Sequence, residues 1–197
     1  MDIGRATTDI GATAVESVEF RMGTQDDEAT LKRLYSYAIT AKPEHMRSRK
    51  NGDDWGFTAE KSAILVVGGE TAGFMAMMDE MHVVYRYAEL LGLNWEEVFM
   101  VMGHIADDYQ GNGYSKKLLN YLFEHAKNEQ KKKQVIGVVC PENEESMGLS
   151  SSAMNQNLVA DFKPSKKRLK ALEFQDVGLK MSIMDQGVLR AIFSKDL

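Results

Sequence analysis

The sequence has little cysteine and no pattern of metal-binding residues. Its 197 residues include one cysteine, Cys140, so no disulfide can form within the chain. This suits a reducing compartment, and we expect a cytoplasmic protein. One cysteine also excludes a cysteine-based zinc site, and the four histidines show no H-x₃-H or H-E-x-x-H spacing. We therefore expect no metal site.

Long apolar runs and a basic surface are also missing. No stretch approaches the roughly 18–20 apolar residues that span a bilayer. Residues 1–17 carry Arg5 as their only basic residue and no apolar block, unlike a secretory signal. We expect residues 1–16 to be a flexible arm and residues 17–197 to be one domain. The net charge is −5, and Lys127–Lys133 is the one basic cluster, so we expect neither a nucleic-acid partner nor membrane association.

The apolar residues that are present predict a sheet. Alternation or short apolar runs between turn signals are typical of strands. The turn signals include Gly68-Gly69, which predicts a hairpin. The expected strands are 18–22, the hairpin 62–81, the nearly all-apolar 96–105, the buried 133–140, and a closing pair, 177–184 and 188–193, joined by the turn 185–187.

Helical spacing predicts the remaining elements. Thr24 is a typical N-cap for a helix that runs to about Thr40, because acidic and amide residues follow it. An amphipathic helix follows Gly113, and its place between two buried strands predicts a parallel strand pair. Short helices are also expected at 43–50 and 165–174, and residues 82–95 are either strand or helical turn. Residues 142–163 are expected to be a loop with at most one helical turn, and its part 146–156 is either a surface loop or a substrate lid. The fold class is therefore α+β, with a mixed, mostly antiparallel sheet of about six or seven strands flanked by helices.

Gly111 and Gly113 lie between an apolar strand and an amphipathic helix. Asn112-Gly113 is a common hairpin turn, but only the upstream side is a strand, so a hairpin fits poorly. Two interpretations stay open. The glycines are a connector without a ligand, or they let backbone N–H groups approach an anion at the helix N-terminus. The spacing matches neither the dinucleotide-binding G-x-G-x-x-G nor the P-loop.

The longer string "HIADDYQGNGYSKKLLNYLFEHA" resembles the acetyl-coenzyme A motif of the GNAT N-acetyltransferase superfamily. That motif is an apolar strand, then [R/Q]-x-x-G-x-[G/A], then an amphipathic helix. Ser115 departs from it, since glycine or alanine is usual there. Residues 18–35 are similar to the family's opening strand and helix, "VVCPENEES" to its fifth strand, and "KALEFQDVG" to the end of its last helix, although Glu173 stands where glycine is usual.

The resemblance implies that acetyl-coenzyme A (acetyl-CoA) is the cofactor. Its pyrophosphate would lie on the loop, its pantetheine arm along the preceding strand, and its thioester carbonyl against an N–H of that strand. The implied cofactor-binding residues are Gly103, Ile105, Gln110, Gly111, Asn112, Gly113, Tyr114, Ser115 and Asn143. The implied acceptor is a primary amine of a small molecule, a protein N-terminus or a lysine. A homodimer is left open.

The resemblance does not identify the catalytic side chains. A protonated amine must lose a proton before it attacks, and Glu97 and His104 are candidate acceptors of equal rank. Strand alternation places His104 on the face opposite Gly103 and Ile105. Phe99 stands where many relatives carry a base. Asp79 and Glu80 are further candidates for the base, on the neighbouring strand. Leu169 stands where the family's general acid is often a tyrosine. A coenzyme A-binding sensor, or an interaction module whose glycines only turn the chain, therefore remain alternatives to an acetyltransferase.

Overall fold

The structure, a computed structural model, describes residues 16–41, 57–79, 81–139, 141–153, 165–172, 174–176, 182–185 and 188–197. The expected arm and the expected helix at 43–50 lie outside these residues, apart from residue 16. So do Cys140, Glu80 and the Gln186-Gly187 part of the closing turn.

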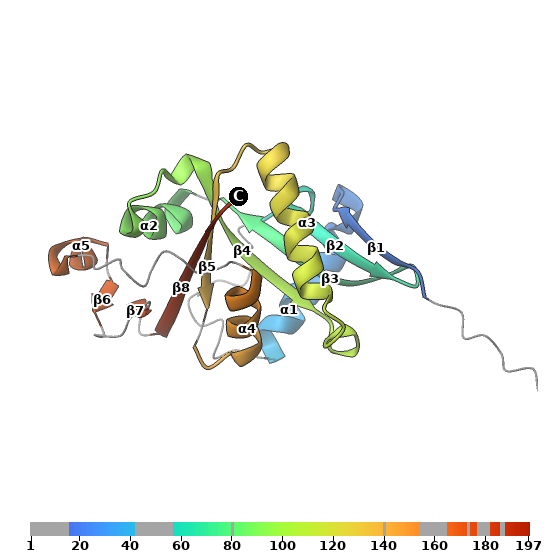
Figure 1. Cartoon of the computed structure of the whole chain (residues 1–197). Coiled ribbons are helices and arrows are strands. Elements are labelled where there is room, and N and C mark those ends of the chain that lie inside the picture. The colour runs from blue at the N-terminus through green and yellow to red at the C-terminus, as the bar shows by residue number, and fades with distance from the viewer. Residues whose placement is uncertain are drawn as a thin grey trace, which may run out of the picture.

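One eight-stranded sheet runs through the molecule in the order β1-β2-β3-β4-β5-β8-β7-β6 (Figure 1). Of the seven pairs that the described strands form, only β4–β5 is parallel, as expected from the strand-helix-strand pattern. The α+β fold class is confirmed. The strands are β1 (Val18–Met22), β2 (Ser62–Val67), β3 (Glu70–Met78), β4 (Val98–Ile105), β5 (Gln134–Val139), β6 (Phe174–Asp176), β7 (Ser182–Asp185) and β8 (Val188–Asp196). The unexpected one is β6, whose three residues are too few to show alternation.

Helices cover both faces of the sheet. One hydrophobic core joins α1 (Glu28–Ala41), α2 (Met81–Leu91) and α5 (Lys166–Ala171) to one face. The other core joins α3 (Tyr114–Asn128) and α4 (Glu144–Ala153) to the opposite face. Figure 1 shows α3 and α4 crossing in front of the strands. Because successive side chains of a strand point to opposite faces, β4 places Met100 in the first core and Phe99 in the second.

Two helices differ from the expectations. The ambiguous residues 82–95 lie mostly in α2, and the expected loop at 142–163 begins with the ten-residue α4. The Ser- and Gly-rich composition of α4 hides a buried side: Met147 and Leu149 pack against the α3 core, and Ala153 is part of it. Tertiary packing therefore stabilises a helix that local propensity does not favour.

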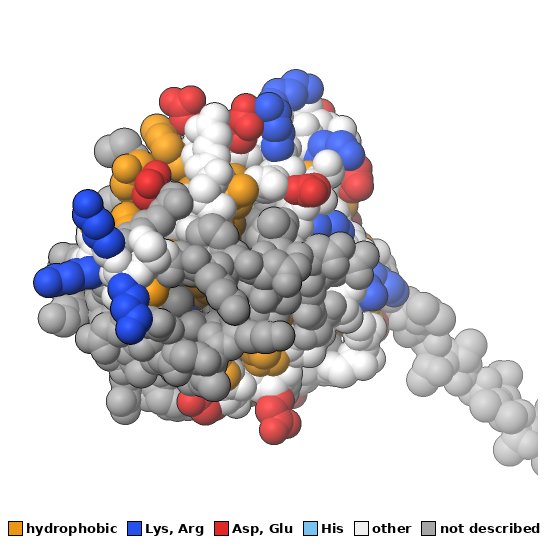
Figure 2. Space-filling model, turned by 60° about the vertical axis from the view of Figure 1, so that its left-hand side comes forward, with side chains coloured by type: hydrophobic (Ala, Val, Ile, Leu, Met, Phe, Trp, Pro, Cys, Tyr) orange, Lys and Arg blue, Asp and Glu red, His pale blue; other side chains and the backbone are white. Residues whose placement is uncertain are grey.

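The short basic helix expected at 165–174 is α5, but it ends at Ala171, and Phe174 belongs to β6. Its exposed lysines are Lys166, Lys167 and Lys170. Figure 2 shows one face of the molecule, with basic side chains gathered at one of its edges and acidic and basic side chains mixed elsewhere. Among the described residues, no helix has both the length and the apolar content to cross a bilayer.

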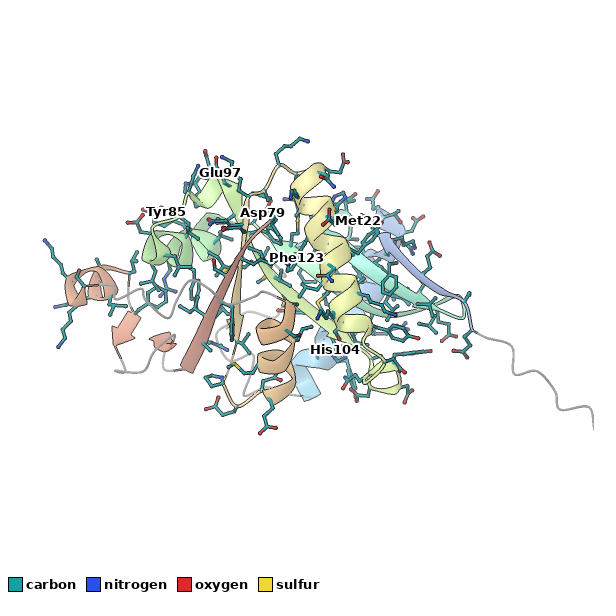
Figure 3. All side chains as sticks on the ribbon, in the orientation of Figure 1. Met22, Asp79, Tyr85, Glu97, His104 and Phe123 are labelled. Carbon is teal, nitrogen blue, oxygen red and sulfur yellow. The ribbon has the colours of Figure 1, made fainter. Side chains whose placement is uncertain are left out.

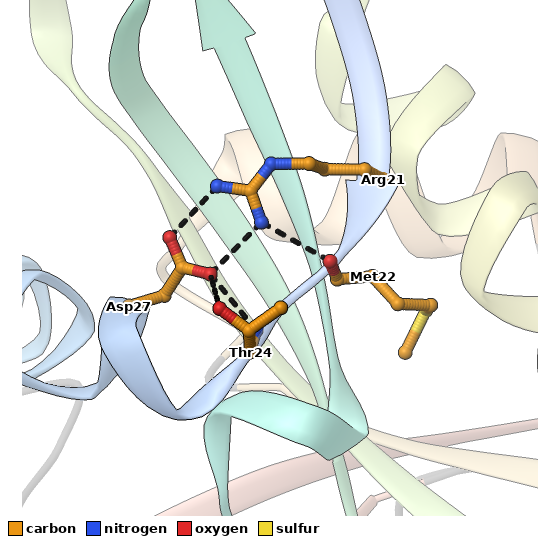
Figure 4. A network of polar contacts seen from close by, with 4 residues as sticks. All are labelled: Arg21, Met22, Thr24 and Asp27. Carbon is orange, nitrogen blue, oxygen red and sulfur yellow. Dashed lines mark hydrogen bonds and ion pairs between the residues drawn. The ribbon is translucent and has the colours of Figure 1, made fainter.

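A polar network joins β1 to the start of α1 (Figure 4). Both terminal nitrogens of Arg21 donate to the carboxylate of Asp27, each over 2.8 Å. The backbone N–H and the hydroxyl of Thr24 donate to the same carboxylate over 2.8 and 3.0 Å, and Thr24 is the N-cap of the 3-10 turn Gln25–Asp27 that leads into α1. The hydrogen bonds from Arg21, and then those from Thr24, hold the pKa of Asp27 well below its usual range, although burial opposes this shift.

Replacing Asp27 by asparagine should destabilise the fold in a pH-dependent way. We expect the free energy of unfolding at pH 7 to fall by about 2 kcal/mol, because charge-assisted hydrogen bonds are lost. A lowered folded-state pKa adds stability above the unfolded-state value of about 3.9, and this stability is lost as the pH falls below it. Urea unfolding should therefore show a gap between wild type and Asp27→Asn that narrows below about pH 4. The exposed neighbour Asp26 provides the control. An equal effect of Asp26→Asn, or a gap that does not change with pH, would contradict the assignment.

Candidate active site

The parallel strands β4 and β5 separate halfway along their length. They pair at three positions, the last of which is Met100 with Ile136. Beyond it β4 continues to Ile105 in register with β3, while β5 continues to Val139 in register with β8. Among the described residues, no strand pairs with the edge of β4 that faces β5 after Met100. The sheet therefore has an open backbone edge in its interior.

The open edge carries two of the expected backbone donors. The N–H of Ala106 donates to the carbonyl of Ala72, next to β3, over 2.9 Å. Backbone groups alternate along a strand, so those of Ile105 and Gly103 face the opposite side, toward β5. Gly103 is exposed. These two N–H groups are therefore placed to meet a ligand laid along β4.

The open edge leads directly into the glycine loop. Gly111 and Gly113 have φ values of 79° and 72°, which side chains other than glycine rarely adopt. A Cβ built on either glycine would meet no other atom within 4 Å, so the loop is not shaped by close packing. Gly113 is the N-cap of α3 and has no side chain to cap the first turn. The first amides of α3 therefore have no intrahelical acceptor, which is the usual geometry of an anion site.

The amide side chains of the loop stabilise the loop itself. Nε2 of Gln110 donates to the carbonyl of Ile105 over 2.8 Å and to Oδ1 of Asp107 over 2.9 Å. Nδ2 of Asn112 donates to the carbonyls of Tyr109 and Gln110, each over 3.2 Å. The backbone amides, rather than these side-chain donors, are thus left to face a ligand.

The residues that open α3 combine packing with positive charge. The ring of Tyr114 lies edge-on to Phe20 of β1, with centroids 6.4 Å apart. Nζ of Lys117 lies 6.0 Å from the Tyr114 ring centroid. Lys116 and Lys117 are exposed, and Ser115 is half-buried, so the loop has two cations within one turn.

Asn143 lies on the other side of the strand separation, just after β5. Its Oδ1 accepts the backbone N–H of Ser146 over 3.0 Å, so it caps α4. Because α4 packs on the same face as α3, the two helices flank the open edge on one side of the sheet. Sequence reasoning assigned Asn143 to the cofactor and did not foresee its capping role.

His104 lies at the loop end of β4 (Figure 3), and its contact with α1 places it on the face expected from strand alternation. Its ring centroid is 5.8 Å from that of Tyr37 on α1. The Tyr37 hydroxyl donates to Oδ2 of Asp107 over 2.9 Å, and this bond raises the pKa of Tyr37. Sequence reasoning missed Tyr37, which is 49% exposed and 70 positions away from Asp107.

Glu97 lies at the opposite end of β4 (Figure 3). It precedes the strand in a short 3-10 turn, and Lys133 pairs with it over 2.6 Å. Six residues of extended chain, about 20 Å, separate it from Gly103. Asp79 is also at the far end of β3 from the loop, and it pairs with Lys61 over 2.8 Å. The structure therefore brings His104, but neither Glu97 nor Asp79, to the loop.

The sequence matches the model of a protein family. The model described as the acetyltransferase (GNAT) family matches residues 29–151, more than half of the chain. The chain belongs to the GNAT family. A search of the curated proteins gave no match.

Solved structures share the GNAT fold at low sequence identity. The structure of yncA from Salmonella typhimurium with acetyl-CoA is 15% identical, with a TM-score of 0.60, and the match covers 92% of this chain and 94% of that one. Aminoglycoside acetyltransferase AAC(6')-Ib with coenzyme A and kanamycin is 16% identical (TM-score 0.53, coverage 91% and 95%). Ribosomal-protein-S5-alanine acetyltransferase from Vibrio fischeri is 14% identical (TM-score 0.52, coverage 91% and 92%).

One expected departure from the GNAT pattern concerns Leu169. It lies in α5 and is 4% exposed, part of the core beneath α2. A buried leucine cannot donate a proton, so this position supplies no general acid. Among the described residues, no group of three His, Cys, Asp or Glu side chains is arranged to hold a metal.

Proposed function

We propose that this protein transfers an acetyl group from acetyl-CoA to a primary amine by direct attack in a ternary complex. The observation that carries the proposal is the open edge of β4, which is joined through the 3-10 turn Asp107–Tyr109 to the glycine loop at the N-terminus of α3. The yncA structure of similar fold holds acetyl-CoA, and the structure of the aminoglycoside acetyltransferase AAC(6')-Ib holds coenzyme A and kanamycin. These neighbours support the choice of cofactor and of an amine acceptor.

The loop would hold the cofactor through its backbone. Amides from Gly111 to Ser115 would donate to the pyrophosphate, with Lys116 and Lys117 adding positive charge. The pantetheine arm would then pair with the open edge of β4. Its thioester carbonyl would face the N–H of Gly103 or Ile105, which stabilises the oxyanion of the tetrahedral intermediate. One such donor is worth roughly 2.7–4 kcal/mol of transition-state stabilisation.

The chemistry requires that the protonated amine loses one proton before attack, that the attacking nitrogen then loses a second proton, and that the leaving thiolate gains one. The neutral amine nitrogen attacks the thioester carbon, the C–S bond breaks, and the thiolate leaves with the electron pair. His104 is the acceptor of the amine proton that the geometry favours, directly or through water, because it lies at the loop end of β4. A thiolate whose conjugate thiol has a pKa near 8.5 can take its proton from solvent.

The buried position of Leu169 favours a second candidate function. A GNAT protein without a general acid at this position could bind coenzyme A or acyl-coenzyme A as a sensor without turnover. The acceptor class, whether a small-molecule amine, a protein N-terminus or a lysine, is the other open choice. The single cysteine suits a cytoplasmic location for either function.

Initial rates with acetyl-CoA and a panel of amines would separate the two functions. We expect release of free coenzyme A thiol above background with at least one amine. Double-reciprocal lines that intersect would indicate a ternary complex, whereas parallel lines would indicate an acyl-enzyme. Cys140→Ser should retain the rate, since direct transfer needs no thiol nucleophile. Tight binding without turnover across the panel would favour the sensor.

A further inference from the structure

We propose that Tyr37 is a positioning residue that ties helix α1 to the cofactor loop, so that coenzyme A binding and the order of α1 are coupled. The inference rests on the proposed function, because it takes the loop between Gly111 and Ser115 as the coenzyme A site. It adds a residue that lies outside the loop, on the opposite side of the sheet from α3.

The contacts form a closed circuit at the end of β4. Tyr37 donates to Oδ2 of Asp107, and Gln110 donates to Oδ1 of the same carboxylate, both over 2.9 Å. The same Gln110 nitrogen holds the carbonyl of Ile105 over 2.8 Å. The next residue back along β4, His104, lies against the Tyr37 ring. One side chain of α1 therefore touches both the first turn of the loop and the end of the strand.

These contacts hold the negative charge of Asp107 in a fixed position beside the loop. Asp107 and Asp108 stand immediately before amides that would bind a pyrophosphate, and a carboxylate free to move there would repel it. Each oxygen of Asp107 instead accepts a side-chain donor, one from Tyr37 and one from Gln110. Tyr37 thus keeps the carboxylate beside α1 and fixes the 3-10 turn Asp107–Tyr109 that precedes the glycines.

Coupling follows because binding is reciprocal. If the position of α1 helps to preorganise the loop, then coenzyme A on the loop must stabilise α1 by the same free energy. The other major contacts of α1 are in its apolar core, where Leu31 and Tyr35 pack below the sheet. The Tyr37 hydroxyl adds a polar contact between α1 and the loop.

The test is a double-mutant cycle with coenzyme A as the probe. Isothermal titration calorimetry would measure the dissociation constant of wild type, Tyr37→Phe, Asp107→Ala and the double variant. We expect Tyr37→Phe to weaken binding about three- to fivefold, because the lost hydrogen bond is exposed to solvent and acts on coenzyme A only through the loop, and to have no effect when Asp107 is already alanine. Tyr85→Phe is the matched control, since Tyr85 is an exposed tyrosine of another helix, α2 (Figure 3).

Hydrogen exchange provides a second readout, which follows the order of α1 directly in wild type and in Tyr37→Phe. Coenzyme A should slow exchange of backbone amides at 35–41 in wild type more than at 81–91, and this protection should be reduced in Tyr37→Phe. Equal binding by wild type and Tyr37→Phe, or effects that multiply in the cycle, would overturn the inference. Wild type that does not bind coenzyme A would instead contradict the proposed function itself.

Discussion

Gly113→Val should lower coenzyme A affinity by about 100-fold or more, because it blocks at least two charge-assisted hydrogen bonds worth about 1.5–3 kcal/mol each. The added side chain would enter the open space over the first amides of α3, where no protein atom lies within 4 Å of the new Cβ. It would also be strained, since φ at Gly113 is 72°. Calorimetry with coenzyme A measures the affinity, and thermal unfolding measures the strain.

Gly92→Val is the control that separates the effect of blocking the cofactor site from the effect of backbone strain. Gly92 has nearly the same φ, 74°, and equally open space around its Cβ, but it follows α2 rather than preceding α3. Both variants should lose about 1–2 kcal/mol of folding stability, because each places a β-branched residue in the left-handed region. Only Gly113→Val should lose the cofactor. If the two variants bind coenzyme A equally well, the loop is a connector and not an anion site.

Gly103→Ala should impair the acetyl transfer step while leaving the loop intact. A Cβ at this position would lie 2.3 Å from Sδ of Met75 and 2.5 Å from the carbonyl oxygen of Phe74 on β3. The carbonyl belongs to the backbone, so the paired strands must shift, at a cost of about 1–3 kcal/mol in folding stability. The same shift moves the N–H groups of the open edge, and a displacement of about 1 Å in such a site can cost 100-fold in rate.

Three measurements distinguish this effect from general destabilisation. The coenzyme A dissociation constant should change little, while kcat with a reactive amine should fall. Met75→Ala in the same background should restore little, since it removes the sulfur contact but not the contact with the Phe74 carbonyl. Gly148→Ala is the matched control: it lies in α4 with open space around its Cβ, and it should raise stability by up to about 1 kcal/mol. Wild-type kcat in Gly103→Ala would contradict the assigned role of this edge.

Local pattern predicted the elements whose apolar residues alternate or repeat strongly. The hairpin at Gly68-Gly69, the central strand β4, the helix after Gly113 and the parallel β4–β5 pair are all confirmed. The helix α4 was missed because Met147, Leu149 and Ala153 are too few among serines to show a helical period. The strand β6 was missed because three residues show no period.

In the candidate site, too, local pattern predicted some features, and long-range contacts were not predicted. Alternation along β4 predicted that Gly103 and Ile105 share one side and that His104 takes the other, and the structure agrees. It did not predict that Glu97 would form an ion pair with Lys133 at the far end of the strand, because that contact joins residues 36 positions apart. The bond between Tyr37 and Asp107 spans 70 positions and has no local signature.

The sequence by itself determined the glycine loop, since φ values near 75° at Gly111 and Gly113 need residues without a Cβ, and these stand directly before a helix. Only the tertiary structure decided that an open edge leads to the loop. The edge exists because β4 stays with β3 while β5 stays with β8 after Met100, and such long-range pairing depends on the whole sheet rather than on any one strand.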